Sequence, residues 1–214
     1  LTYSCTQRPL PLCLILAAGP PQAPQRYTGL TGRMEQPPLW ALGYHQSRWG
    51  YASFADLDAL DEKFRSPKIP CDGLWLDIDY MEGFRVFTFN EKHFSSPKNQ
   101  IEDLKTRGRR VVPILDPGVK ADPEFEVFRE GVKKDLFCRT AEGQPFTGIV
   151  WPGETVYPDF SLPECREWWA ERVKSFAGGG FGGLWIDMND PSTGPVDPGD
   201  MLFGRGKIPH EAWH

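Results

Sequence analysis

Short apolar runs alternate with amphipathic stretches along most of this chain. From residue 39 onward, four apolar runs are each bounded by polar or turn-forming residues. They predict β-strands at residues 40–46, 74–78, 111–115 and 183–187. Because most positions in these runs are apolar, rather than every second one, they favour a parallel sheet covered by helices on both faces. The pattern therefore predicts an α/β fold.

Helical periodicity fills the segments between the predicted strands. In the first such segment the apolar side chains recur every three or four residues, at Phe54, Leu57, Leu60 and Phe64. This is the spacing of one helix face. Four helix starts carry N-terminal signals of the capping or proline type. They are Ser53 with Asp56, Ser96 with Pro97, Asp122 with Pro123, and Ser161 with Glu164.

The same periodicity predicts which side chains of the next two helices face the core. They are Ile101 and Leu104 in one helix, and Phe125, Phe128 and Val132 in the other. Less regular segments predict a short extra strand at residues 84–89, a hairpin at residues 136–150 and a loop at residues 191–206.

Residues 1–38 differ in composition, because seven prolines interrupt any helical pattern. We expect a Pro-rich connector from a preceding β domain, irregular except for a short strand at residues 12–17, and without a long helix. The apolar residues 10–18 have two interpretations, a buried strand or the core of a signal peptide. Since the five cysteines form no CxxC pair, we expect a cytoplasmic location, with secretion as the alternative.

One strand of the predicted sheet is repeated. Residues 73–79 (GLWLDID) and 183–189 (GLWIDMN) agree at four of seven positions. Two strands in one environment suit a barrel, whereas a doubly wound dinucleotide fold would carry a GxGxxG after a strand, which this chain lacks. A full (β/α)8 barrel needs about 250 residues. The four strands predicted here therefore indicate the N-terminal half of a (β/α)8 TIM barrel at residues 39–214.

Charge and motif content exclude several classes of partner. The chain has 24 Lys and Arg against 29 Asp and Glu, a net charge of −5, and no basic stripe, so we expect no nucleic-acid partner. No apolar run approaches the length of a membrane span. The four histidines and five cysteines form no metal-binding motif, so neither a metal nor a cofactor is predicted.

Acidic side chains stand at the ends of three predicted strands. They are Asp77, followed by Asp79, then Asp116 and Asp187. In a parallel barrel the carboxyl ends of the strands meet on one face, where active sites lie. Tryptophans are interleaved with these carboxylates, at Trp75, Trp151 and Trp185. Indole rings stack on sugar rings and carboxylates accept hydrogen bonds from hydroxyls, so the combination favours a carbohydrate site and, with two carboxyl groups, glycoside hydrolysis.

These carboxylates have two other interpretations. Each could simply cap the loop or helix that follows its strand. Alternatively, they could bind Mg²⁺ for a phosphate substrate, which is disfavoured because the chain has neither a P-loop nor a basic cluster. The residues by themselves do not choose which of Asp77, Asp116 and Asp187 would react.

Seven short motifs occur in a fixed order along the chain. They are residues 42–51 (LGYHQSRWGY), 75–81 (WLDIDYM), 87–89 (FTF), 114–117 (ILDP), 150–153 (VWPG), 158–160 (PDF) and 185–189 (WIDMN). Together they make residues 30–206 closely resemble glycoside hydrolase family 31, the α-glucosidase family. The resemblance implies a (β/α)8 catalytic barrel and a retaining mechanism on α-linked glucosides or oligosaccharides.

The resemblance also implies roles for individual residues. Asp187 matches the nucleophile of the family, which forms a covalent glycosyl-enzyme, and Asp77 matches the aspartate that binds sugar hydroxyls. Asp116 matches a supporting carboxylate. The other substrate-binding positions match pocket-lining residues of the family; they are Ile78, Ile114, Trp151, Trp185 and Met188.

Some features depart from the family pattern. Asp190 stands where the family usually has Glu, and the sequence before Tyr27 fits poorly. The acid/base Asp of the family lies on a later strand, past His214. We therefore expect residues 39–214 to be a partial catalytic domain, truncated before the acid/base strand and inactive alone. A non-catalytic carbohydrate-binding relative and an inactive fragment are the alternatives.

Overall fold

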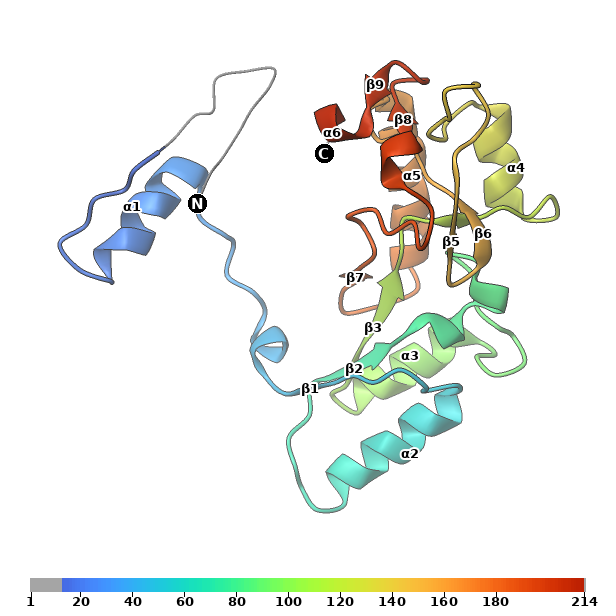
Figure 1. The fold of residues 1–214 in the computed structure, drawn as a ribbon. Coiled ribbons are helices and arrows are strands. Elements are labelled where there is room, and N and C mark those ends of the chain that lie inside the picture. The colour runs from blue at the N-terminus through green and yellow to red at the C-terminus, as the bar shows by residue number, and fades with distance from the viewer. Residues whose placement is uncertain (1–12, 214) are drawn as a thin grey trace. The chain divides into compact units, whose positions relative to one another are not determined.

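The computed structural model describes residues 13–213 (Figure 1). The boundary between its two compact units falls between Pro38 and Leu39. The N-terminal unit contains the helix α1 (Gln22–Thr31), which has no buried residue. The prediction of no long helix here was wrong. Pro24 lies in the first turn of α1, where the backbone N–H groups have no intrahelical partner, so the proline costs no hydrogen bond.

The predicted strand at residues 12–17 is also absent where the structure describes it. Residues 13–17 have no regular secondary structure, and Leu12 lies outside the described residues. The side chains of Leu14 and Leu16 are largely exposed. With no neighbouring strand to supply hydrogen bonds, the apolar run by itself does not form a strand.

The unit at residues 39–214 is organised by a parallel sheet of four strands. They are β1 (His45–Gln46), β2 (Gly73–Leu76), β3 (Arg110–Leu115) and β7 (Trp185–Ile186), in the order β1-β2-β3-β7. Each neighbouring pair is parallel. The prediction of a parallel sheet from four near-continuous apolar runs is confirmed.

A helix lies in each connection between neighbouring strands of this sheet. They are α2 (Phe54–Arg65), α3 (Pro97–Thr106) and α5 (Pro163–Ala177). Figure 1 shows α2 and α3 beside β1, β2 and β3, whereas α5 belongs to the other end of the unit. Strands that follow chain order with helical crossovers are the expected arrangement of the first half of a (β/α)8 barrel.

Two of the predicted strands are shorter than expected. Residues 39–42 form the 3₁₀-helix η1 (Leu39–Leu42), so only His45 and Gln46 of the first run join the sheet. In the last run only Trp185 and Ile186 pair with a neighbour. A strand continues only as far as the neighbouring strand offers backbone groups for hydrogen bonding. The length of an apolar run does not indicate where that pairing ends.

The extra strand predicted at residues 84–89 does not form. The segment follows the 3₁₀-helices η2 (Ile78–Tyr80) and η3 (Glu82–Phe84). Phe84 and Phe87 have positive φ angles of 61° and 66°. An extended strand requires a strongly negative φ, so this backbone turns repeatedly instead.

The segment between β3 and α5 adds a small antiparallel sheet. Its strands β4 (Val119–Lys120), β6 (Gly153–Val156) and β5 (Thr147–Val150) are adjacent in that order. The hairpin predicted at residues 136–150 is found in part, because Thr140 N–H donates to the Gln144 carbonyl around a turn at residues 141–143. However, β5 forms its own hairpin with β6, which the prediction missed.

Three capping predictions fail for identifiable reasons. The helix α4 (Glu126–Lys133) begins later than expected: Asp122 Oδ1 accepts from the N–H of Glu124 in a turn before the helix, while its Oδ2 pairs with Arg85. Ser161 does not cap α5; its hydroxyl donates to Asp159. Ser96 precedes Pro97 at the start of α3, as predicted, but its side chain makes no capping hydrogen bond.

The predicted loop at residues 191–206 contains short elements. They are η4 (Pro198–Asp200) and β8 (Leu202–Phe203), which pairs with β9 (Ile208–Pro209) before α6 (His210–Trp213). Val132 of α4 is 47% exposed, so its predicted inward position is wrong. By contrast, Leu57, Ile101 and Leu104 are buried as predicted. Each such side chain stabilises the fold by about 1.5–3 kcal/mol relative to an exposed position.

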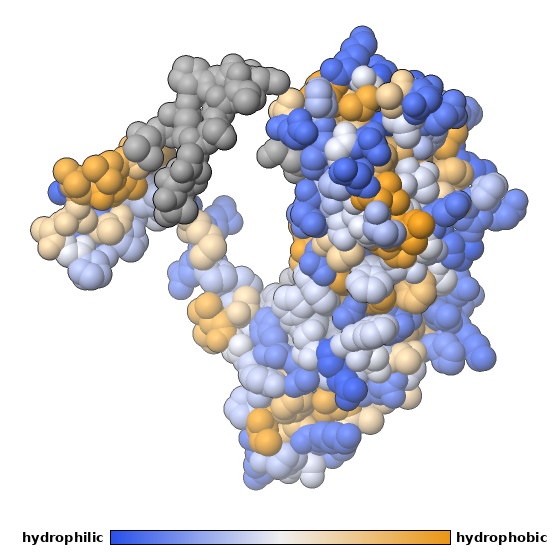
Figure 2. All heavy atoms as spheres, in the orientation of Figure 1, coloured by the Kyte–Doolittle hydropathy of each residue, from blue (hydrophilic) through white to orange (hydrophobic). Residues whose placement is uncertain are grey.

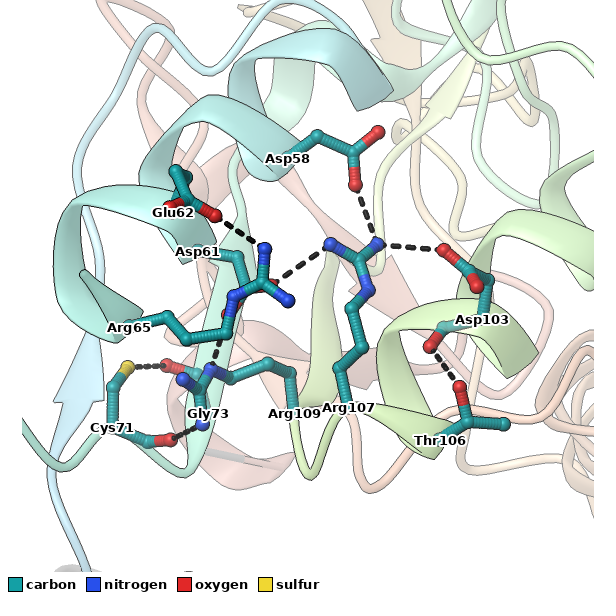
Figure 3. Close-up of polar contacts among 10 residues, drawn as sticks. All are labelled: Asp58, Asp61, Glu62, Arg65, Cys71, Gly73, Asp103, Thr106, Arg107 and Arg109. Carbon is teal, nitrogen blue, oxygen red and sulfur yellow. Dashed lines mark hydrogen bonds and ion pairs between the residues drawn. The ribbon is translucent and has the colours of Figure 1, made fainter. Parts of the chain in front are cut away.

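A buried ion-pair network fixes the helices to the start of the parallel strands (Figure 3). Asp61 of α2 is fully buried and accepts hydrogen bonds from Arg107 Nη1 at 2.8 Å and Arg109 Nε at 2.7 Å. Arg109 also donates to the Cys71 carbonyl at 2.6 Å, just before β2. Because a buried carboxylate is stable only when it is paired, this network holds α2, the end of α3 and both strands in one arrangement.

The surface of the structure is mixed in character. Figure 2 shows a mostly hydrophilic face interrupted by apolar residues. Among the large exposed apolar side chains are Trp49, Trp151 and Ile186. No helix within residues 13–213 is long and apolar enough to cross a membrane.

Candidate active site

Three carboxylates each follow the last residue of a parallel strand. β2 ends at Leu76 and is followed by Asp77, β3 ends at Leu115 and is followed by Asp116, and β7 ends at Ile186 and is followed by Asp187. Since β2, β3 and β7 are parallel neighbours, their carboxyl ends lie at the same edge of the sheet. The structure therefore brings together the three aspartates that the sequence singled out.

The charges of these groups act on one another. Burial, followed by the charges of Asp187 and Asp77, raises the pKa of Asp116 to about 7. Asp116 is only 8% exposed, and its Oδ1 atom has no hydrogen-bond partner among the described residues. No cation is among the causes of the shift. A negative charge on Asp116 is thus opposed both by its burial and by the charges of its two neighbours.

The segment after β2 holds two further contacts at this edge. Asp77 Oδ1 accepts a hydrogen bond of 2.8 Å from the N–H of Ile78, which fixes the carboxylate at the start of η2. Burial and the charge of Asp77 raise the pKa of Asp79, whereas a hydrogen bond from Trp49 lowers it. Within residues 13–213, no group of three or more His, Cys, Asp or Glu side chains is placed to hold a metal ion.

A small pocket unites four of the predicted site residues. Ile78, Asp116, Trp151 and Met188 all line it. Trp151 is 49% exposed, so its indole is accessible from solvent. Met188, directly after Asp187, has a φ of 59° in the left-handed region. A non-glycine residue adopts this backbone only when its surroundings impose it, and such positions concentrate at functional sites.

The other predicted residues are not among those that line this pocket; they are Asp77, Asp187, Trp185 and Ile114. Trp185 contacts Trp75, with ring centroids 5.7 Å apart. Ile114 is 2% exposed and thus belongs to the core, where its carbonyl accepts a hydrogen bond of 2.7 Å from the Tyr80 hydroxyl. Burial, together with the charge of Asp116, raises the pKa of Tyr80.

One contact at this edge of the sheet was missed by the sequence patterns. Trp75 Nε1 donates a hydrogen bond of 3.0 Å to Nδ1 of His45, which lies on β1, 30 residues earlier. The pattern assigned no role to His45. The only available signal was a histidine at the end of one predicted strand and a tryptophan two residues before Asp77 on the next.

Comparison with known proteins gives a consistent set of similarities. Residues 34–211 match the profile of the Glycosyl hydrolases family 31 TIM-barrel domain. Alpha-glucosidase 2 of Bacillus thermoamyloliquefaciens is 48% identical over 169 residues, covering 79% of this chain and 22% of that protein. The neutral alpha-glucosidase AB of Sus scrofa is 39% identical over 172 residues, covering 79% of this chain and 18% of that protein.

A solved structure agrees with the sequence relatives. The crystal structure of a glucosidase II alpha subunit in its DNJ-bound form superimposes with a TM-score of 0.82 at 35% identity, covering 92% of this chain and 22% of that one. The chain thus spans about a fifth of the length of the curated relatives it matches.

Proposed function

Since the chain belongs to family 31 of the glycosyl hydrolases, we propose that it carries the nucleophile part of a retaining α-glucosidase active site, with Asp187 as the nucleophile. The observation that supports this most is the common edge of β2, β3 and β7, where Asp77, Asp116 and Asp187 follow their strands directly. The names of the relatives support α-glucosides as the substrate class.

In the first chemical step, Asp187 reacts with the sugar. Its carboxylate oxygen attacks the anomeric carbon, the bond from that carbon to the leaving oxygen breaks, and a glycosyl ester of Asp187 forms. The leaving oxygen takes a proton from a second carboxyl group, about 5–5.5 Å from the nucleophile in retaining enzymes. Water then hydrolyses the ester and returns the proton to that second group.

The neighbouring side chains bind the sugar and tune the charge of the site. Asp77 accepts hydrogen bonds from sugar hydroxyls, since its Ile78 contact occupies only Oδ1. Trp151 and Trp185 offer indole faces to the C–H groups of the ring. With Asp116 neutral at pH values below about 7, it adds no third negative charge beside the nucleophile.

The second carboxyl group belongs to another part of the complete site. We propose that this acid stands on a later strand of the barrel, as the resemblance to the family implies. We propose that the activity requires that strand together with residues 34–211. A carbohydrate-binding relative without catalysis would have the same pocket but no turnover, so activity decides between the two.

A chimera supplies the further strands that this proposal requires. In it, residues 34–211 replace the matching segment of alpha-glucosidase 2 from Bacillus thermoamyloliquefaciens, of which this chain covers 22%. The assay follows release of 4-nitrophenol from its α-glucoside, with the unmodified relative as the positive control. The matched variant pair is Asp187→Ala and Asp197→Ala; Asp197 is an exposed aspartate on the η4 turn, away from the strand ends.

The expected outcome is turnover in the chimera and in Asp197→Ala, and a loss of at least about 10³-fold in Asp187→Ala, as for the removal of other catalytic nucleophiles. Azide should then restore turnover in Asp187→Ala by taking the place of the carboxylate, with a β-glucosyl azide as the product. A folded chimera that binds glucose but shows no turnover would favour the carbohydrate-binding relative. Full activity in Asp187→Ala would overturn the proposed nucleophile.

A further inference from the structure

Two tryptophan rings lie on the sheet face directly below the candidate carboxylates. Trp75 and Asp77 are two residues apart, as are Trp185 and Asp187, so in each pair both side chains point to the same face of the sheet. The strands β2 and β7 are separated by β3, yet the two rings meet with their centroids 5.7 Å apart and their planes at 56°. The ring pair therefore joins the two strands that Asp77 and Asp187 follow.

His45 fixes the outer ring of this pair by a defined hydrogen bond. Its Nδ1 accepts from Trp75 Nε1 at 3.0 Å, and its Nε2 lies 3.0 Å from the Trp40 carbonyl oxygen. An indole N–H can only donate and a carbonyl can only accept. Both contacts are satisfied together only when His45 carries its proton on Nε2 and presents the lone pair of Nδ1 to Trp75.

The surroundings hold the imidazole in this position. The Trp40 ring stacks on it, with centroids 5.4 Å apart and planes at 13°. On the neighbouring strand, a Cβ atom at Gly73 would come within 2.8 Å of Nδ1. The imidazole thus occupies space that exists only because residue 73 has no side chain, and it cannot move away from Trp75 without losing the stack with Trp40.

We propose that His45 is a positioning residue of the active site, which sets the orientation of Trp75 and, through their ring contact, that of Trp185. The inference rests on the proposed function in so far as Trp185 contacts the sugar. The polar and ring contacts of His45 are with Trp40 and Trp75. His45 acts through the rings of Trp75 and Trp185. Its loss leaves both rings free to change their orientation.

Two substitutions separate this role from simple packing. In His45→Asn, the side-chain oxygen takes the place of Nδ1 and can still accept from Trp75. In His45→Gln, the amide reaches the place of Nε2 and can still donate to the Trp40 carbonyl, but the acceptor for Trp75 is lost. Both variants keep one of the two hydrogen bonds, so a purely structural role predicts similar effects for both.

The hydrogen bond itself is tested in the 214-residue chain by a double-mutant cycle on unfolding in urea. The cycle combines His45→Gln with Trp75→Phe, which keeps the aromatic ring and removes the N–H donor. If the two side chains are directly bonded, Trp75→Phe should change the folding equilibrium constant about fivefold less in the His45→Gln variant than in the parent chain. Additive effects would overturn the contact. This measurement does not depend on any activity.

The positioning role is tested in the chimera described above. We expect His45→Gln and Trp75→Phe each to lower kcat/KM about fivefold or more, without a further loss in the double variant, and His45→Asn to recover most of that loss. A chimera without turnover would contradict the proposed function. The double-mutant cycle on unfolding of the 214-residue chain would still test the hydrogen bond between His45 and Trp75. An active chimera in which His45→Asn loses as much kcat/KM as His45→Gln would overturn the positioning role.

Discussion

Ile114 of β3 pairs with Trp185 of β7 in the parallel sheet, and each is followed two residues later by an aspartate. This register places Asp116 and Asp187 next to each other at the carboxyl edge of the two strands. The charge of Asp187 consequently acts on Asp116, whose pKa is raised to about 7 mainly because the group is buried. One pair of residues in the sheet thus determines which carboxyl groups interact in the site.

The first prediction concerns stability against pH. The folded-state pKa of Asp116, about 7, exceeds the ordinary value of 3.8, so the folded protein binds this proton more tightly than the unfolded chain does. Stability from this group is therefore fully present below about pH 4 and is lost as the pH rises towards 7. Asp116→Asn, which cannot ionise, should remove this loss and gain on the order of 2–4 kcal/mol relative to the parent between about pH 4 and pH 8.

Urea unfolding of both proteins across this range measures the effect. Asp200→Asn is the matched control, because Asp200 is exposed on the surface and its substitution should leave the slope unchanged. A difference between Asp116→Asn and the parent that is the same at every pH would contradict a buried, proton-binding Asp116.

The second prediction concerns sugar binding by Asp77. In the chimera, Asp77→Asn replaces a charged acceptor by a neutral amide of the same shape, with its contact to Ile78 N–H retained through the amide oxygen. Loss of a charge-assisted hydrogen bond is expected to lower kcat/KM by roughly 10- to 100-fold. Steady-state kinetics on an aryl α-glucoside measure the change. If kcat/KM is unaffected, Asp77 does not contact the sugar.

The third prediction concerns the network around Asp61 (Figure 3). Asp61→Ala leaves Arg107 and Arg109 without their fully buried partner, and should destabilise the fold by about 3–5 kcal/mol. The matched control on the same helix is Glu62→Gln, which breaks an exposed pair with Arg65 and should change the stability far less, because solvent screens this pair. Equal free energies of unfolding for the two variants would show that the burial of Asp61 does not matter.

The fourth prediction concerns the 214-residue chain by itself. It should show no measurable release of 4-nitrophenol from its α-glucoside, because no positioned acid would protonate the leaving oxygen. Proton transfer of this kind contributes about 10²–10⁴-fold to the rate. The assay needs a folding control, for which near-UV circular dichroism of the tryptophans is suitable. Turnover that disappears in Asp187→Ala would place the acid within these residues.

The sequence predicted the parallel core well because its signals there are local and strong. β3 (Arg110–Leu115) lies within one residue of its predicted bounds, and α3 (Pro97–Thr106) begins at the predicted proline. An unbroken apolar run and a proline at the start of a helix each act within a few residues. The three strand-end aspartates were found for the same reason, since each directly follows a recognisable strand.

The predictions failed where the local structure depends on contacts between residues that are far apart in the sequence. Ser161 has the sequence signature of a helix cap, but its hydroxyl accepts a hydrogen bond from the N–H of Gly204, 43 residues later. The link between His45 and Trp75 spans 30 residues and depends on the register of β1 with β2. Neither partner is visible in a local pattern. Electrostatic properties such as the raised pKa of Asp116 likewise depend on burial, which only the folded structure defines.

The most direct measurement of the central claim is identification of the residue that becomes glycosylated. The chimera is incubated with a fluorinated α-glucosyl fluoride, which forms the ester with the enzyme faster than that ester is hydrolysed. The labelled protein is then digested, and its peptides are sequenced by mass spectrometry. We expect a single glycosyl label on Asp187, absent from Asp187→Ala. A label on Asp77 or Asp116, or turnover without any labelled carboxylate, would contradict it.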